Sequence, residues 1–158
     1  MNRKTKTRLI VRIALTVYFL LLLKLILFKN VDYLFFGNYS KYYGLHSLRL
    51  SWGRANFIPF RTLYYYFSLQ EKFETGLENI GGNIVLFIPY GFLLPVAFSS
   101  CARFNRSLLV IVFSSLFFET CQLFLAYGNF DVDDIILNTI GGLIGYLLFR
   151  WVYKIVTS

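Results

Sequence analysis

Apolar residues run along this chain in four long stretches that are separated by more polar segments. A helix needs about 20 apolar residues to cross a hydrocarbon core about 30 Å thick. The stretches reach about this length, and we place the corresponding spans at about residues 9–28, 80–100, 107–127 and 133–153. The pattern predicts an all-α membrane protein whose fold is a bundle of four transmembrane helices.

The composition supports a membrane protein and argues against an ordinary soluble domain. Hydrophobic residues make up 57% of the chain, charged residues make up 15%, and the mean hydropathy is +0.58. Soluble domains are less apolar and contain roughly 25% charged residues. Because 158 residues is the size of one domain, we expect a single membrane domain over residues 1–158.

The cations that give the net charge of +8 lie beside the predicted spans. They occur in residues 3–12, at Arg103 and Arg106 between the second and third spans, and at Arg150 and Lys154 near the end of the chain. Short segments rich in Lys and Arg stay on the cytoplasmic side of a membrane. We therefore expect a multi-pass protein of the cell membrane with both termini in the cytoplasm. Because the cations form no separate basic domain, we expect no nucleic-acid partner.

A polar and aromatic segment, residues 29–79, separates the first and second spans. Tyrosine and phenylalanine are frequent in its first part, from Tyr33 to Tyr43. Because Tyr and Trp favour the headgroup level of a bilayer, we predict that this outer loop lies along the membrane surface. Within the loop, apolar residues recur at helical spacing over residues 62–73, which predicts an interfacial helix.

Ionisable side chains interrupt two of the apolar stretches. Glu119 lies inside the third span, where an ionisable group costs roughly 2.5 to 3.5 kcal/mol on insertion scales, so we interpret it as part of a site or as a structural lock. Ser115 and Gln122 share its helix face by their spacing. Lys24 lies near the end of the first span, and we interpret it as a side chain that snorkels to the outer interface.

Three aspartates open the fourth span, where unpaired backbone N–H groups and the helix dipole favour negative charge. Capping the helix needs only one of them. The predicted topology brings the aspartates to the outer half of the bundle together with polar residues of the other spans. This arrangement predicts a polar pocket that faces the cell-wall side and consists of Asn83, Glu119, Gln122, Asp131, Asp133, Asp134 and Asn138.

Proline and glycine residues within the spans indicate how the helices pack. Proline removes helical hydrogen bonds, so we expect Pro89 and Pro95 to kink the second span. Gly141 and Gly145 form a small-xxx-small step, which allows another helix to approach closely. We assign helix packing to the set Pro89, Gly91, Gly141, Gly142 and Gly145.

The two cysteines, Cys101 and Cys121, are expected to be free thiols. If the residues between them are helical, they lie about 30 Å apart, which is too far for a disulfide. Their spacing matches no metal-binding motif, and we expect neither a metal site nor a cofactor.

Four blocks of residues, in their order and spacing, resemble the VanZ-like family of small bacterial membrane proteins, which is named for a factor associated with teicoplanin resistance. The blocks are NFIPF at residues 56–60, NIGGNIVLFIPYG at residues 79–91, ETCQ at residues 119–122, and DVDD with NTIGG within residues 131–142. Together they reach across residues 54–148. The resemblance implies a membrane fold and tolerance to glycopeptide antibiotics.

The chain departs from this family at one visible position. The family often has an arginine between the glutamate block and the aspartates, where this chain has Gly128 and Asn129. If that arginine pairs with a carboxylate, an arginine of the outer loop must replace it. We therefore consider Arg54, Asn56 and Arg61 as loop contributors to the site.

Three functions from different classes are compatible with these residues. In the first, the pocket binds a membrane lipid, a lipoglycopeptide or a lipid-linked cell-wall molecule and alters how teicoplanin-type antibiotics bind at the cell surface. In the second, the carboxylates form a membrane-embedded active site for lipid or lipid-linked cell-wall substrates, as general bases or as oxygen ligands of a divalent cation. In the third, the polar side chains only hold the helices together, since interhelical hydrogen bonds contribute about 0.6 to 2 kcal/mol each.

Overall fold

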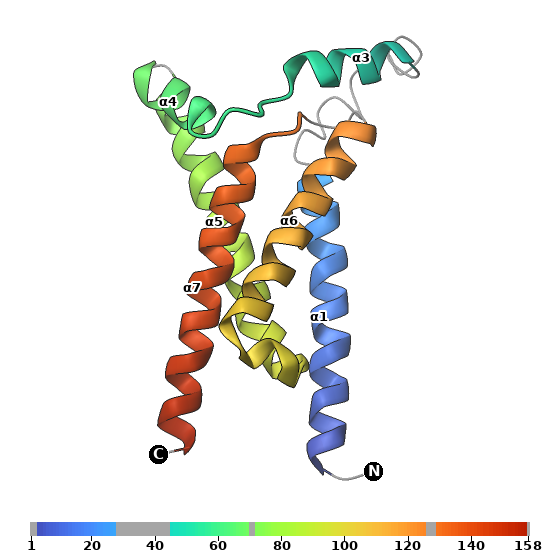
Figure 1. Ribbon diagram of the computed structural model, residues 1–158, viewed down its shortest axis with the longest axis vertical. Coiled ribbons are helices and arrows are strands. Elements are labelled where there is room, and N and C mark those ends of the chain that lie inside the picture. The colour runs from blue at the N-terminus through green and yellow to red at the C-terminus, as the bar shows by residue number, and fades with distance from the viewer. Residues whose placement is uncertain (1–2, 28–44, 70–71, 126–128, 158) are drawn as a thin grey trace.

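The computed structural model describes residues 3–27, 45–69, 72–125 and 129–157. Four long helices form a bundle in this part of the chain (Figure 1). They are α1 (Arg3–Leu27), α5 (Phe73–Ala97), α6 (Phe104–Leu125) and α7 (Val132–Thr157). All four are long and apolar enough to cross a membrane, which confirms the predicted all-α membrane fold.

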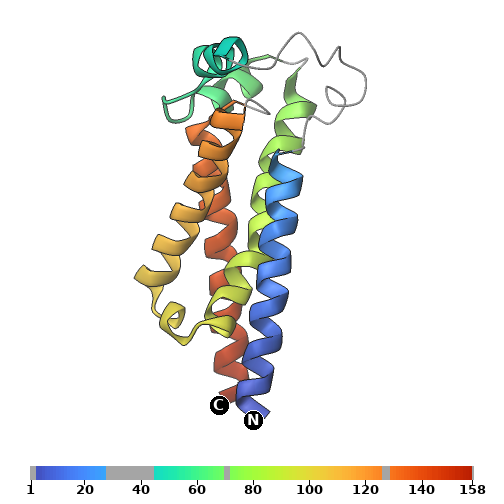
Figure 2. The same ribbon diagram turned by 90° about the vertical axis from the view of Figure 1, so that its right-hand side faces the viewer.

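Two short helices cover one end of the bundle. The helices α3 (Leu45–Arg54) and α4 (Arg61–Ser68) lie across the ends of the long helices, and both termini lie at the opposite end (Figures 1 and 2). A 3₁₀ helix, η3 (Ser99–Ala102), connects α5 to α6. The side of the membrane on which the termini lie stays a prediction from the charges.

The helix boundaries in the outer loop differ from the predicted ones. The aromatic stretch from Tyr33 to Tyr43 lies outside the described residues. The predicted interfacial helix at residues 62–73 is shorter in the structure, because Leu69 adopts an extended conformation that ends α4. The helix α5 already begins at Phe73, because its first turns continue through polar residues that a hydropathy pattern does not assign to a span.

The helices α5 and α7 approach each other at backbone contact distance. A Cβ atom added to Gly141 would lie 2.1 Å from the carbonyl oxygen of Ile84, and one added to Gly145 would lie 2.0 Å from that of Ile88. A Cβ atom on Gly91 would lie 1.9 Å from the carbonyl oxygen of Gly142. Small residues allow such close packing between membrane helices. The α5–α7 pair is therefore packed backbone to backbone along this contact.

Buried apolar side chains from three of the long helices fill the core. Leu22 of α1, Phe87 of α5, and Phe118 with Ile111 of α6 are all fully buried. The rings of Phe87 and Phe118 meet edge to face, with their centroids 6.0 Å apart. The long helices are therefore held together by aromatic and aliphatic packing below the polar end of the bundle.

Large apolar side chains also cover the outer faces of the long helices. Val17, Phe113 and Leu147 are 61%, 64% and 60% exposed. Exposing such surfaces to water would cost free energy, whereas contact with hydrocarbon carries no such cost. The outer faces of the long helices are therefore apolar, as contact with hydrocarbon requires.

Candidate functional site

A cavity of about 590 Å³ lies among all four long helices. We call it the four-helix cavity. Lys24 and Gln122 contribute to its wall from α1 and α6, at the end of the bundle nearer to α3 and α4. The remaining lining residues are Leu25, Ile26, Gly82, Asn83, Val85, Leu86, Glu119 and Asp134. The wall combines a polar part with an apolar part.

Asn83 and Asp134 join α5 to α7 at this cavity. The Nδ2 of Asn83 donates to the Oδ1 of Asp134 at 2.7 Å and to the Oδ1 of Asn79 at 2.8 Å. Asn79 lies one helical turn above Asn83, and its own Nδ2 donates to the hydroxyl of Tyr66 at 3.4 Å. A chain of polar groups therefore leads from α4 into the cavity.

The hydroxyl of Tyr66 lies at the α4 end of this series of hydrogen bonds, and it stays protonated there. Burial raises the pKa of Tyr66, and the negative charges of Asp134 and Asp131 raise it further, while the hydrogen bond from Asn79 acts in the opposite direction. A neutral phenol can accept the N–H of Asn79 and still donate its own proton. Tyr66 therefore acts as a neutral hydrogen-bonding group.

Glu119 and Gln122 face the cavity from α6. Glu119 is 1% exposed, and its Oε2 accepts the backbone N–H of Asp131 at 3.0 Å. The Nε2 of Gln122 donates to the carbonyl oxygen of Ile26 at 3.0 Å, which ties α6 to α1. The helical spacing of these residues predicted their common face, and the structure places both at the same cavity.

Lys24 lines the four-helix cavity and was missed as a site residue by the sequence analysis. Its position near the end of an apolar stretch is equally typical of a snorkelling side chain, so the local pattern contains no signal that separates the two roles. Only the placement of α1 beside α5 reveals that Lys24 lines the same cavity as two carboxylates.

Asp133 contacts the start of α4 and does not line the cavity. Its fully buried carboxylate accepts the backbone N–H of Phe60, that of Thr62 at 2.8 Å and that of Leu63 at 3.2 Å. These N–H groups at the start of a helix have no partner within it. Asp133 therefore caps α4 from a distant part of the chain and fixes that helix on α7.

Asp131 and Asn56 complete this contact, which we call the α4–α7 junction (Asn56, Thr62, Asp131 and Asp133). The backbone N–H of Asn56 donates to the carbonyl oxygen of Phe130 at 2.8 Å. The Nδ2 of Asn56 donates to the Oδ1 of Asp131 at 2.9 Å, and the hydroxyl of Thr62 donates to its Oδ2 at 2.5 Å. Asp131 also caps α7, since its Oδ1 accepts the N–H of Asp133 at 2.8 Å. Thr62 was not identified from the sequence.

Asn138 lies deeper in the bundle, between α6 and α7. Its Nδ2 donates to the hydroxyl of Ser115 at 2.9 Å, and its Oδ1 is buried without a hydrogen-bond partner. It is not among the residues that line the cavity. The structure thus separates the predicted polar cluster into three groups: Asn83, Glu119, Gln122 and Asp134 at the cavity, Asp131 and Asp133 at the α4–α7 junction, and Asn138 in the core.

Arg54 and Arg61, the proposed replacements for the arginine of the family, are exposed. Among the described residues, no group of three or more His, Cys, Asp or Glu side chains is arranged to hold a metal ion.

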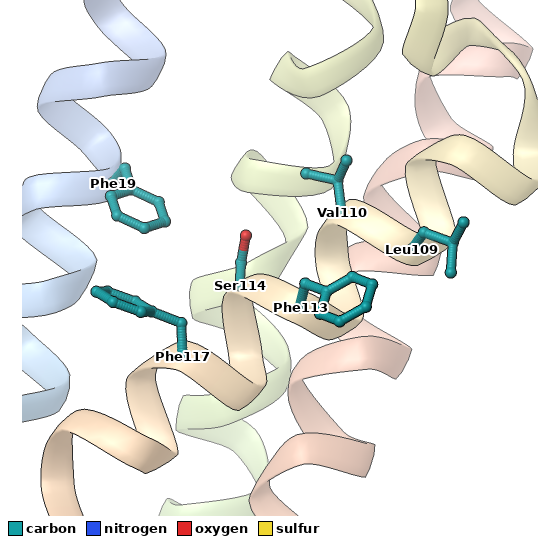
Figure 3. A pocket seen from close by; sticks show the side chains of 6 residues that line it. All are labelled: Phe19, Leu109, Val110, Phe113, Ser114 and Phe117. Atoms are coloured by element: carbon teal, nitrogen blue, oxygen red, sulfur yellow. The ribbon is translucent and has the colours of Figure 1, made fainter. Parts of the chain in front are cut away.

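A second hollow lies between α1 and α6, and it is apolar (Figure 3). It measures about 370 Å³ and is lined by Phe19, Leu109, Val110, Phe113, Ser114 and Phe117. Its one polar side chain, Ser114, is 2.6 Å from the hydroxyl of Tyr90 and is hydrogen-bonded to it. The candidate chemistry of the described residues therefore lies in the four-helix cavity.

Comparisons with known proteins agree with this architecture. The sequence profile of the VanZ/LLP1 family matches residues 15–153. Over 67 residues the chain is 40% identical to Protein VanZ of Enterococcus faecium, and the aligned part is 42% of this chain and 41% of that protein. The chain thus aligns with less than half the length of this curated relative. No solved structure matches the chain. Because the profile extends from α1 to α7 and covers most of the sequence, the chain belongs to the VanZ/LLP1 family.

Proposed function

We propose that this protein binds a lipid-anchored ligand in the four-helix cavity and thereby alters how teicoplanin-type lipoglycopeptides bind at the cell surface. The single observation that carries the proposal is a cavity of about 590 Å³ that is lined by ionisable side chains from three spanning helices and by apolar side chains beside them. Ionisable residues at membrane depth are costly and mark sites of function. The amphipathic wall suits a ligand with a polar head and a hydrocarbon tail.

The orientation of the bundle supports access from the outer leaflet. The last turns of α7, which contain Arg150 and Lys154, end where both termini lie (Figure 1), whereas Asp134 of the cavity wall lies in the first turn of the same helix. Because cation-rich segments mark the cytoplasmic side, we expect the cavity to lie near the outer surface. A lipoglycopeptide or a lipid-linked cell-wall molecule would reach the cavity there from within the membrane.

The hypothesis that the polar side chains only hold the helices together explains part of the predicted cluster. It does not explain the residues that line the cavity. Asp131 and Asp133 are occupied by the α4–α7 junction, and the glycines of α7 contact the backbone of α5. These groups explain the architecture without a ligand. Glu119 and Asp134 also line an open volume, which packing alone does not require.

The test is tolerance to antibiotics in a susceptible Gram-positive host that expresses the protein. We expect tolerance to teicoplanin to rise more than tolerance to vancomycin, because only teicoplanin carries a fatty acyl tail that a membrane cavity can sense. We expect Glu119→Gln and Asp134→Asn to lose this tolerance while they reach the membrane at normal abundance. The matched control is Glu78→Gln, which removes the same charge from an exposed position of α5.

Equal tolerance to both antibiotics, or to neither, would contradict the proposal. Retained tolerance in both cavity variants at normal abundance would show that these carboxylates are not part of the site. Loss of abundance in both variants, with Glu78→Gln normal, would assign the carboxylates to structure. Analysis of membrane lipids from the same cells would detect a chemically altered lipid, which binding without catalysis does not produce.

A further inference from the structure

We propose that the segment joining α3 to α4 is a docking surface for the headgroups of anionic phospholipids. We call it the arginine-flanked segment (residues 54–61). It lies at the end of the bundle opposite to the two termini (Figure 1). The proposal concerns a surface away from the four-helix cavity and does not depend on the proposed function. Three features support it: exposed apolar side chains, a constrained backbone and a one-sided charge.

The middle of the arginine-flanked segment exposes large apolar side chains. Phe57, Ile58 and Phe60 are 56%, 59% and 63% exposed. Contiguous apolar side chains on a surface mark contact with another protein or with a membrane. Because α3 and α4 lie across the ends of helices long enough to span a bilayer, this segment reaches the level at which the headgroups meet water (Figure 1). The lipid interface is therefore the apolar surface closest to it.

The backbone of the segment is held so that these side chains stay outside the bundle. Phe60 has a φ of 67°, in the left-handed region that bulky residues rarely adopt. The carboxylate of Asp133 accepts the backbone N–H of Phe60, and the Oδ1 of Asn56 accepts that of Ile58 at 3.0 Å. Contacts of this kind maintain a strained conformation, and such conformations cluster at functional sites.

The charge of this region is positive on its exposed side. Arg54 and Arg61 flank the apolar side chains, and both are exposed. Residues 45–69 contain three arginines and no aspartate or glutamate. The carboxylate of Asp133, which lies beside α4, is fully buried and accepts backbone N–H groups. Apolar side chains next to arginines match an anionic interface, where hydrocarbon lies directly below the phosphates.

Membrane topology does not explain these arginines. Cation-rich segments mark one face of a membrane, and the end of the bundle with both termini already carries Arg150 and Lys154 on α7. The arginines at the opposite end therefore need another partner. A guanidinium group offers a planar set of donors that matches two oxygens of a phosphate. The phosphate of an anionic phospholipid supplies this partner in the leaflet that surrounds the segment.

The helix α4 continues the same surface. Arg61, Tyr64 and Tyr65 share one face of α4 by their spacing, and all three are exposed. Tyr66 lies on the other side of α4, where its hydroxyl accepts the N–H of Asn79 on α5. Tyrosine side chains favour the headgroup level of a bilayer. The face of α4 that points away from α5 is thus suited to lipid headgroups.

The experiment measures how closely the segment approaches lipid headgroups. In a background without native cysteines, Ile58→Cys is labelled with an environment-sensitive fluorophore, and the full chain is reconstituted into nanodiscs. The bilayers are phosphatidylcholine with or without phosphatidylglycerol, and both contain the same fraction of a lipid with a nitroxide quencher on its headgroup. Each arginine at an anionic surface strengthens association by about fivefold. We therefore expect phosphatidylglycerol to raise the ratio of quenched to unquenched fluorophore at least about fivefold at low salt.

The matched variants separate this surface from the general charge of the protein. We expect Arg54→Gln with Arg61→Gln to abolish the effect of phosphatidylglycerol, and Arg103→Gln with Arg106→Gln, also exposed, to preserve it. High salt should abolish the effect in the unsubstituted segment, because exposed charges are screened, and this comparison needs no arginine variant. Equal quenching with and without phosphatidylglycerol, or no quenching in either bilayer, overturns the proposal. An effect that persists in Arg54→Gln with Arg61→Gln also overturns it.

Discussion

Replacing Gly141 by alanine tests whether the backbone contact between α5 and α7 holds the bundle together. The added Cβ would lie 2.1 Å from the carbonyl oxygen of Ile84, whereas ordinary contact begins at 3.4 Å. The neighbouring atom belongs to a helix backbone, so no side chain can rotate away. The two helices must therefore separate by about 1 Å along this contact, and overpacking of this kind costs roughly 1 to 3 kcal/mol.

The same substitution at Gly81 is the matched control. Nothing lies within 4 Å of a Cβ at this position, which is on the same helix pair. Alanine in a helix is favoured over glycine by roughly 0.5 to 1 kcal/mol, so Gly81→Ala should be neutral or stabilising. Gly142→Ala should also destabilise the bundle, because its Cβ would lie 2.6 Å from the Cγ2 of Ile111, a β-branched side chain that is fully buried.

The assay is thermal unfolding in detergent. Unfolding is monitored as the decrease in the amount of monodisperse protein with temperature. For a chain of this size about 1 kcal/mol corresponds to roughly 2 to 4 °C in Tm. We expect Gly141→Ala to melt at least several degrees below Gly81→Ala. Equal melting temperatures for these two variants would refute the reasoning, because they would show that the backbone contact contributes nothing specific to stability.

Two further predictions concern the α4–α7 junction and the topology. Asp133→Ala removes the acceptor of three backbone N–H groups at the start of α4. We therefore expect the free energy of unfolding to fall by about 2 kcal/mol and proteolysis within residues 55–69 to become faster. Unchanged proteolysis would contradict the capping role. In a background without native cysteines, a cysteine at the exposed Asn129 should be labelled from outside intact cells, whereas one at the exposed Asn105 should be labelled only after permeabilisation. Labelling of Asn105→Cys in intact cells would reverse the proposed orientation.

Much of the fold follows from local properties of the sequence. The length of each apolar stretch indicates a spanning helix, because a helix rises 1.5 Å per residue and the bilayer core has a definite thickness. Helical spacing also places Ser115, Glu119 and Gln122 on one face of α6, and all three are buried in the structure. The family resemblance is confirmed by the profile match over residues 15–153.

Only the tertiary structure determined which role each polar residue has. Asp133 and Asp134 are adjacent in sequence, yet the first caps α4 and the second lines the cavity. Their side chains point about 100° apart around α7, so each meets whichever helix the fold places there. Lys24 likewise lines the cavity because α1 packs beside α5. Hydropathy and periodicity describe each helix alone, whereas these roles depend on contacts between residues that are distant in sequence.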